Sequence, residues 1–153
     1  MSPEAAIRSA FPVNPVAKDF FRSADAHVQD MKIELENRVQ GRPWPSLSLM
    51  DWRMIGGSPA SWREYLWPGT FAYYLPSILI GTLLEPTFVD LALEAIVPNN
   101  QQHRPRGDWW FSFTEAFDNH QRRAIRDFLA ALREGPLEIR DEELLSVAET
   151  IWA

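Results

Sequence analysis

The sequence predicts an all-α fold, a compact bundle of about six helices around a central apolar helix kinked by a proline, with at most one short extended segment. The first reason is that apolar residues recur at steps of three and four along most of the chain, which is the helical period. The second is that serine, aspartate, proline and glycine stand where these patterns begin and end. The third is that only residues 109–113 have strand composition, and no second strand of equal strength is present to pair with them.

The size and composition fit one helical domain over residues 1–153. A chain of 153 residues is long enough to bury roughly two-thirds of the surface that its unfolded form exposes. Hydrophobic residues make up 46% and charged residues 24%, which is typical of a globular chain and not of a disordered one. We therefore expect no second independent domain.

The N-terminal part is predicted to contain two of the main helices and a loop-rich stretch. A short helix is expected over residues 3–11, where Pro3 suits the first turn and Ser2 the cap. Residues 17–40 have the clearest amphipathic pattern, and the helix expected there is either continuous or interrupted near Ser23, where Asp25 could restart it. Prolines and glycines break the pattern over residues 42–67, so we expect a loop there, with two short helices at 47–55 and 59–66.

The middle of the chain is predicted to supply the centre of the fold. Residues 70–84 are apolar on nearly all sides, which is typical of a helix that is buried all round. Pro76 removes one amide hydrogen bond, so it should bend this helix or mark its true start. A further helix is expected at 87–96.

The C-terminal part is predicted to hold a lone extended segment and two helices. Residues 109–113 are expected to be extended and packed on helices. Asp118 or Asn119 suits the cap of an amphipathic helix that ends at Gly135. The last helix is expected to begin at Asp141, with acidic residues in its first turn.

The charge pattern argues for a protein partner and against nucleic acid. The formal net charge is −6, from 21 acidic and 15 basic side chains, which disfavours binding to phosphates. Residues 67–102 hold three acids and no Lys or Arg, and the residues after Gly135 hold five acids against Arg140. Two acidic surfaces are therefore predicted, and they would attract a basic partner. The alternative is that these charges serve solubility only.

Several classes of function find no support in the sequence. Cysteine is absent, which excludes disulfides and thiolate chemistry and favours the reducing cytoplasm. The start of the chain lacks the pattern of a secretory signal, and its longest apolar stretch, residues 71–84, is shorter than the roughly 20 residues of a membrane span. The three histidines show no metal-binding spacing, and phosphate loops and a nucleophile elbow are missing. We therefore predict no catalytic residue, metal site, cofactor or membrane contact.

Two groups of residues are candidates for binding. Arg104 lies near Trp109 and Trp110, and Arg and Trp are enriched in binding hot spots. The alternative for this arginine-rich stretch is surface ion pairing with neighbouring aspartates. The second group is Tyr73 and Tyr74 beside Pro76, with Gln121 further along the chain. In a structural interpretation, a tyrosine hydroxyl or the Gln121 amide would satisfy a backbone group freed by the kink at Pro76.

The second group also carries a resemblance. The run Tyr73-Tyr74-Leu75-Pro76 inside an apolar helix, followed by Phe117-Asp118-Asn119-His120-Gln121, resembles an uncharacterised bacterial domain-of-unknown-function family of about this length. In that family a Tyr-Leu-Pro helix precedes a Phe-Thr-x-x-Gln segment. Here six residues, and not two, separate Phe113-Thr114 from Gln121. The resemblance covers about Trp44 to Leu132 and implies a small helical protein, with no catalytic residue assigned.

The sequence favours one function and leaves two others open. The first hypothesis is a non-enzymatic protein-binding module, of the inhibitor or immunity type, for a basic partner. The alternative is a small-ligand binder or enzyme with a pocket beside the helix segment Tyr73–Pro76. Its lining would comprise Tyr73, Tyr74, Arg104, Trp109 and Gln121. The third is a homo-oligomer in which exposed tryptophans of two copies bury one another.

Overall fold

The computed structural model describes residues 1–22, 29–98 and 107–153, and in these parts the chain is all-α, as predicted. The described residues form nine α-helices and two short 3-10 helices and no strand, and 72% of these residues are helical. The α-helices are α1 (Pro3–Ala10), α2 (Gln29–Arg38), α3 (Leu49–Ile55), α4 (Pro59–Tyr65), α5 (Pro68–Leu84), α6 (Val89–Ala95), α7 (Gly107–Glu115), α8 (Asn119–Glu134) and α9 (Ile139–Trp152). The 3-10 helices are η1 (Trp44–Ser46) and η2 (Pro86–Phe88).

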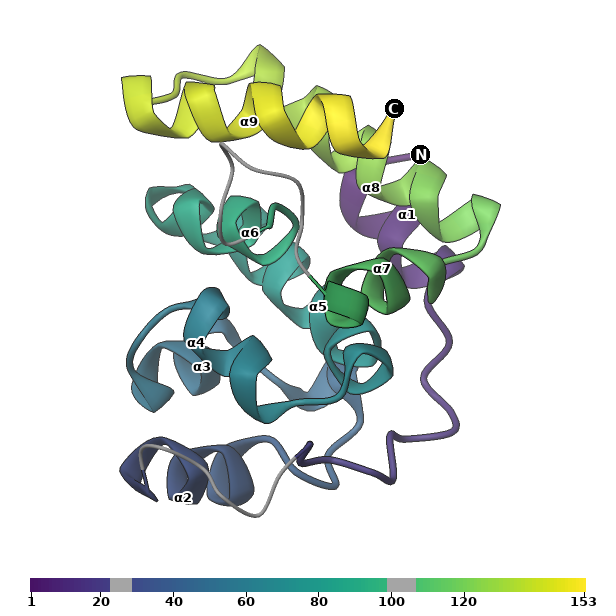
Figure 1. Ribbon diagram of the computed structural model, residues 1–153. Helices are drawn as coiled ribbons and strands as arrows, with labels where there is room; N and C mark the ends of the chain where they lie inside the picture. Colours follow the sequence, from purple (N-terminus) through teal and green to yellow (C-terminus); the bar gives the residue numbers. More distant parts are fainter. Residues whose placement is uncertain (23–28, 99–106) are drawn as a thin grey trace.

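Helix α5 lies at the centre of the molecule, as its all-round apolar sequence predicts. It packs against α1, α3, α6 and α7, and α8 and α9 lie side by side across one end (Figure 1). Pro76 lies inside α5 and does not mark its start. Ser2 caps α1 and Asp118 caps α8, each through a side-chain oxygen that accepts a backbone N–H, as expected from the sequence.

The predicted extended segment at 109–113 is wrong, because these residues belong to α7. Trp109, Trp110 and Phe113 bring their rings together at helical spacing, and Phe113 is fully buried. Phe111 points away from this group and is 65% exposed. Aromatic residues favour strands only where a pleated surface surrounds them, and here the surroundings are helices.

The helix predicted over 17–40 is wrong in its first part and present in its second. Within the described residues, only Gln29–Arg38 is helical in this range, while residues 23–28 lie outside the described part. Residues 17–22 are not helical, and Phe21 forms an isolated antiparallel bridge with Leu66. The apolar spacing misleads because Phe20 belongs to this irregular segment and packs edge-on against Tyr74 of α5, with ring centroids 6.1 Å apart.

Other boundaries differ less. The last helix begins at Ile139, two residues before the expected Asp141. The stretch predicted as a helix at 87–96 divides into η2 and α6. The six predicted helices are the main ones. The two short helices expected in the loop-rich stretch are also present, as α3 and α4, and α7 replaces the extended segment, which gives nine α-helices in the described residues.

One contiguous hydrophobic core includes residues from α1 to α9. Four tryptophans are at most 2% exposed, namely Trp44, Trp52, Trp62 and Trp152. Of the seven tryptophans, all within the described residues, Trp67 alone is strongly exposed, at 46%. A homo-oligomer that buries exposed tryptophans of two copies would therefore have Trp67 as its one strongly exposed tryptophan.

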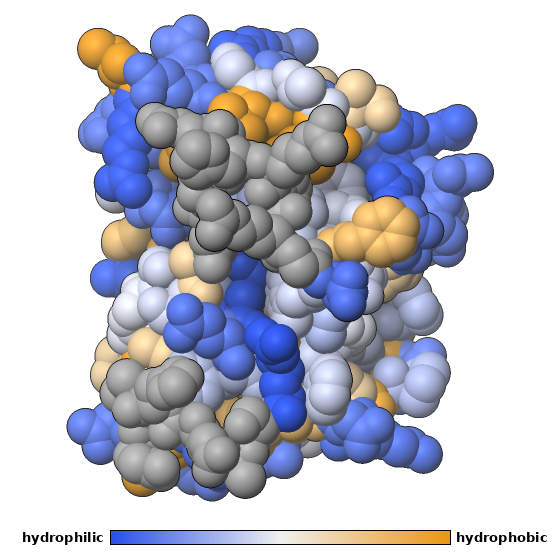
Figure 2. Space-filling view, viewed as in Figure 1, coloured by the Kyte–Doolittle hydropathy of each residue, from blue (hydrophilic) through white to orange (hydrophobic). Residues whose placement is uncertain are grey.

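On the face shown in Figure 2, patches of hydrophobic atoms are separated by hydrophilic ones. No helix in the described part of the chain is long and apolar enough to cross a membrane.

Candidate functional site

The structure distributes the six predicted site residues over different places. Tyr73 and Gln121 line one hollow, and Trp109 and Trp110 lie beside a buried arginine. Tyr74 points to the turn after α2. Arg104 lies outside the described residues. The predicted set is therefore not a single site.

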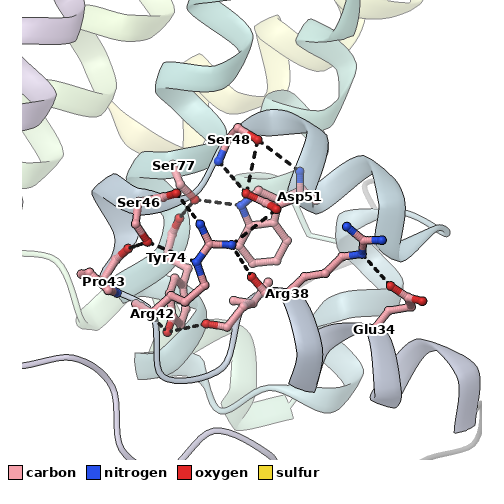
Figure 3. A network of polar contacts seen from close by, with 11 residues as sticks. Glu34, Arg38, Arg42, Pro43, Ser46, Ser48, Asp51, Tyr74 and Ser77 are labelled. Atoms are coloured by element: carbon pink, nitrogen blue, oxygen red, sulfur yellow. Dashed lines mark hydrogen bonds and ion pairs between the residues drawn. The ribbon is translucent and has the colours of Figure 1, made fainter.

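Tyr74 has a structural environment. Its hydroxyl donates to the carbonyl oxygens of Arg42 at 2.8 Å and Val39 at 3.2 Å, which ties α5 to the turn that follows α2 (Figure 3). Burial raises the pKa of Tyr74 to about 12, with a smaller contribution from Tyr73. Arg42 also pairs with Asp51 of α3 at 3.4 Å. The Tyr74 hydroxyl is thus engaged with backbone carbonyls and does not face a hollow.

Trp109 and Trp110 surround Arg63, which the sequence analysis missed. The Arg63 side chain is 4% exposed and donates to the carbonyls of Glu94 at 2.9 Å and Ala95 at 3.0 Å, at the end of α6. Its guanidinium carbon lies 5.5 Å from the centroid of Trp110 and 6.0 Å from that of Trp109. Burial lowers the pKa of Arg63 to about 10, although the Glu94 carboxylate opposes the shift. An arginine next to a tryptophan in sequence carries no signal of burial, so this contact was not predictable.

Tyr73 and Gln121 line a hollow of about 250 Å³ at the N-terminal end of α5, which we call the Tyr73 hollow. Its lining comprises Phe11, Pro12, Gly69, Ala72, Tyr73, Ala116, Phe117 and Gln121. The Tyr73 hydroxyl donates to the Val13 carbonyl at 2.7 Å and accepts the Trp44 backbone N–H at 3.2 Å. Gln121 accepts the Asp118 backbone N–H at 2.9 Å through its side-chain oxygen, in a capping box at the start of α8.

These contacts exclude the predicted repair of the α5 backbone. The Tyr73 and Tyr74 hydroxyls bond carbonyls outside α5, and the Gln121 amide oxygen caps its own helix. The interpretation in which one of these groups satisfies a backbone group freed at Pro76 is therefore wrong.

A second hollow is acidic and lies between η2–α6 and the turn from α8 to α9; we call it the acidic hollow. Its volume is about 480 Å³, and Asp90, Glu138 and Asp141 line it. Arg140 also lines it but pairs with Glu94 at 2.9 Å. Burial raises the pKa of Asp141, and the neighbouring Asp90 and Glu138 raise it further. The two acidic segments of the sequence thus meet at one place.

In the regions that the structure describes, no three or more His, Cys, Asp or Glu side chains are placed to hold a metal ion. Comparison of the chain with protein-family models, with curated proteins and with solved structures finds no match. The resemblance to the uncharacterised family with a Tyr-Leu-Pro helix stays a prediction.

Proposed function

We propose that this chain is a non-enzymatic protein-binding module that receives a basic segment of its partner in the acidic hollow. The observation that carries the proposal is the meeting of Asp90, Glu138 and Asp141 around one concave surface. Among the described residues that line it, Arg140 is the one cation, and its charge is offset by Glu94. Carboxylates in this arrangement repel one another, and a guanidinium or ammonium group between them would relieve the repulsion.

The pKa of Asp141 supports this reading. It is raised because burial and the nearby carboxylates disfavour the charged form. A cation held between the carboxylates would lower that pKa again, so binding and deprotonation of Asp141 favour each other. The net charge of −6 would speed the approach of a basic partner.

An exposed apolar residue lies next to the acidic hollow in the sequence. Ile139 lies between two lining residues in the sequence and is 80% exposed. A partner segment in which Arg or Lys stands beside an apolar side chain would contact both the acidic hollow and Ile139. Charges at the rim of an interface mainly set the specificity and the association rate. An inhibitor or immunity-type role in the cytoplasm belongs to the same proposal.

A charge-matched pair of variants tests the proposal. Asp90→Asn/Asp141→Asn removes two charges from the acidic hollow, and Asp127→Asn/Glu36→Gln removes two exposed charges that lie on α8 and α2. The probe is a fluorescein-labelled peptide of alternating arginine and leucine, and its anisotropy is measured at low and at physiological salt. We expect the first variant to weaken binding about tenfold and the second less than about twofold, because screening and distance reduce the effect of remote charges.

Two results would count against the proposal. Equal weakening by both variants would mean that the peptide senses only the net charge. Binding that is unchanged in Asp90→Asn/Asp141→Asn would place the contact elsewhere. The same pair of variants, used as baits in the native host, shows whether a captured protein depends on the acidic hollow.

A further inference from the structure

Three of the residues that line the Tyr73 hollow are small, namely Gly69, Ala72 and Ala116. Gly69 and Ala116 are exposed, so the hollow is open to solvent on this side, and a Cβ atom built on Gly69 would meet no other atom within 4 Å. The hollow measures about 250 Å³. An engineered apolar cavity of about 150 Å³ holds benzene, so the Tyr73 hollow has room for one substituted aromatic ring.

The walls of the hollow are apolar and aromatic. Phe11 and Phe117 meet edge to face, with ring centroids 6.0 Å apart. The Tyr73 ring forms another wall, and its hydroxyl is already held by Val13 and Trp44. No residue in the lining carries a charge. Such walls favour an uncharged ring, because aromatic pairs gain from edge-to-face and offset contacts and no side chain of the lining would pair with a charge.

Gln121 gives the hollow one polar group with a defined direction of hydrogen bonding. Its side-chain oxygen accepts the Asp118 backbone N–H at 2.9 Å, so only the NH₂ group of the amide is available for a further hydrogen bond. Within the described part of the chain, this NH₂ group has no hydrogen-bond acceptor. It can therefore donate to an acceptor atom on a molecule in the hollow.

We propose that the Tyr73 hollow is a binding site for a small, uncharged aromatic molecule that carries a carbonyl oxygen. The ring packs among Phe11, Tyr73 and Phe117, and the carbonyl accepts a hydrogen bond from the Gln121 NH₂ group. A wide groove lined by Lys18, Phe21 and Trp67 shares Gly69 and Tyr73 with the hollow and provides the way in. This site is separate from the acidic hollow, and neither proposal depends on the other.

The first test separates the polar contact from the apolar one. Acetophenone and ethylbenzene have nearly the same shape, and only acetophenone has a carbonyl. We expect both to shift NMR signals of residues around Tyr73 in the full chain, with acetophenone binding about three- to tenfold more tightly. In Gln121→Glu the carboxylate keeps the capping box but cannot donate, so acetophenone should lose its advantage over ethylbenzene while α8 stays intact.

The second test fills the hollow. Gly69→Leu places a large side chain at the open edge that the hollow shares with the wide groove and replaces a poor helix former, so the fold should persist and both probes should lose binding. Ala130→Leu, at an exposed position of α8, is the matched control and should bind as the wild type does. Absence of binding to the wild type at millimolar concentrations would overturn the proposal, and so would binding that survives Gly69→Leu. An unchanged preference for acetophenone in Gln121→Glu would overturn the role of Gln121.

Discussion

The indole N–H of Trp52 donates a hydrogen bond of 2.8 Å to the hydroxyl of Ser77, and through it α3 is attached to the central helix α5. Trp52 is fully buried and Ser77 is 4% exposed, and the Ser77 hydroxyl donates onward to the Tyr74 carbonyl at 2.6 Å. Within the described residues, no buried side-chain nitrogen or oxygen lacks a partner. The described core is thus apolar, and its buried polar side-chain atoms are hydrogen-bonded.

Ser77→Ala should lower the free energy of unfolding by about 1–3 kcal/mol, because it leaves the buried indole N–H of Trp52 without an acceptor. Urea unfolding followed by circular dichroism measures the loss. Ser112→Ala, at an exposed position of α7, is the control and should be neutral or slightly stabilising. If both variants unfold at the same urea concentration as the wild type, the hydrogen bond contributes nothing to stability.

Two glycines of α5 should respond to alanine in opposite directions. A Cβ on Gly81 would lie 2.9 Å from the Cβ of Leu49, so Gly81→Ala should overpack the contact between α5 and α3 and destabilise the fold by about 1–3 kcal/mol. Gly69→Ala meets no atom and should stabilise the fold by up to about 1 kcal/mol, because alanine is the better helix former. Thermal unfolding of both variants gives the two signs. Equal shifts would mean that helix propensity alone decides both positions.

What the sequence predicted well was local. Ser2 and Asp118 act as caps because the acceptor oxygen and the N–H that it binds are three residues apart, whatever the rest of the chain does. The central position of α5 followed from its lack of a polar face. The extended form of 109–113 failed because the rings of α7 pack against Phe71 of α5 and Trp152 of α9, which are far away in the chain.

The sites depended on contacts between distant residues, and the sequence predicted them only in part. Tyr73 and Gln121 were both named and do share a hollow, but Tyr74 and the two adjacent tryptophans serve other contacts. The acidic segments were recognised from their charge. That they meet depends on the packing of α6 against α9, which brings Glu94 to Arg140 across 46 residues of chain.

Arg63 should prove far more important for stability than Arg140, although both lie beside Glu94. Arg63→Met leaves the carbonyls of Glu94 and Ala95 without their buried donor, and we expect a loss of about 3 kcal/mol or more. Arg140 is 75% exposed in its side chain, so Arg140→Met should cost less than about 1 kcal/mol. Chemical denaturation of the two variants checks the order.

A conservative variant of the same residue separates charge from geometry. Arg63→Lys keeps the positive charge but lacks the planar fork that reaches both carbonyls and stacks beside the tryptophans, so its loss should be intermediate. Equal stability of the lysine variant and the wild type would show that only the charge at the end of α6 matters. Equal losses for Met and Lys would show that the fork alone matters.

Tyr74→Phe should destabilise the protein in a way that depends on pH. At neutral pH it removes the donor to the carbonyls of Val39 and Arg42, and we expect a loss of about 1–2 kcal/mol. The folded state raises the pKa of Tyr74 to about 12, against an ordinary value near 10. The unfolded chain therefore loses this proton first, and the wild type loses stability as the pH rises from about 10 through 12.

The phenylalanine variant lacks that proton, so the difference in unfolding free energy between the two proteins should narrow by about 1 kcal/mol between pH 9 and 11. Urea unfolding of both proteins at these pH values measures it. Other groups that titrate in this range, including Arg63, are present in both proteins and cancel in the difference. A constant difference across the range would mean that the Tyr74 hydroxyl ionises as readily in the folded protein as in the unfolded chain. We expect otherwise, because the hydroxyl is buried against two carbonyl oxygens that would repel a phenolate.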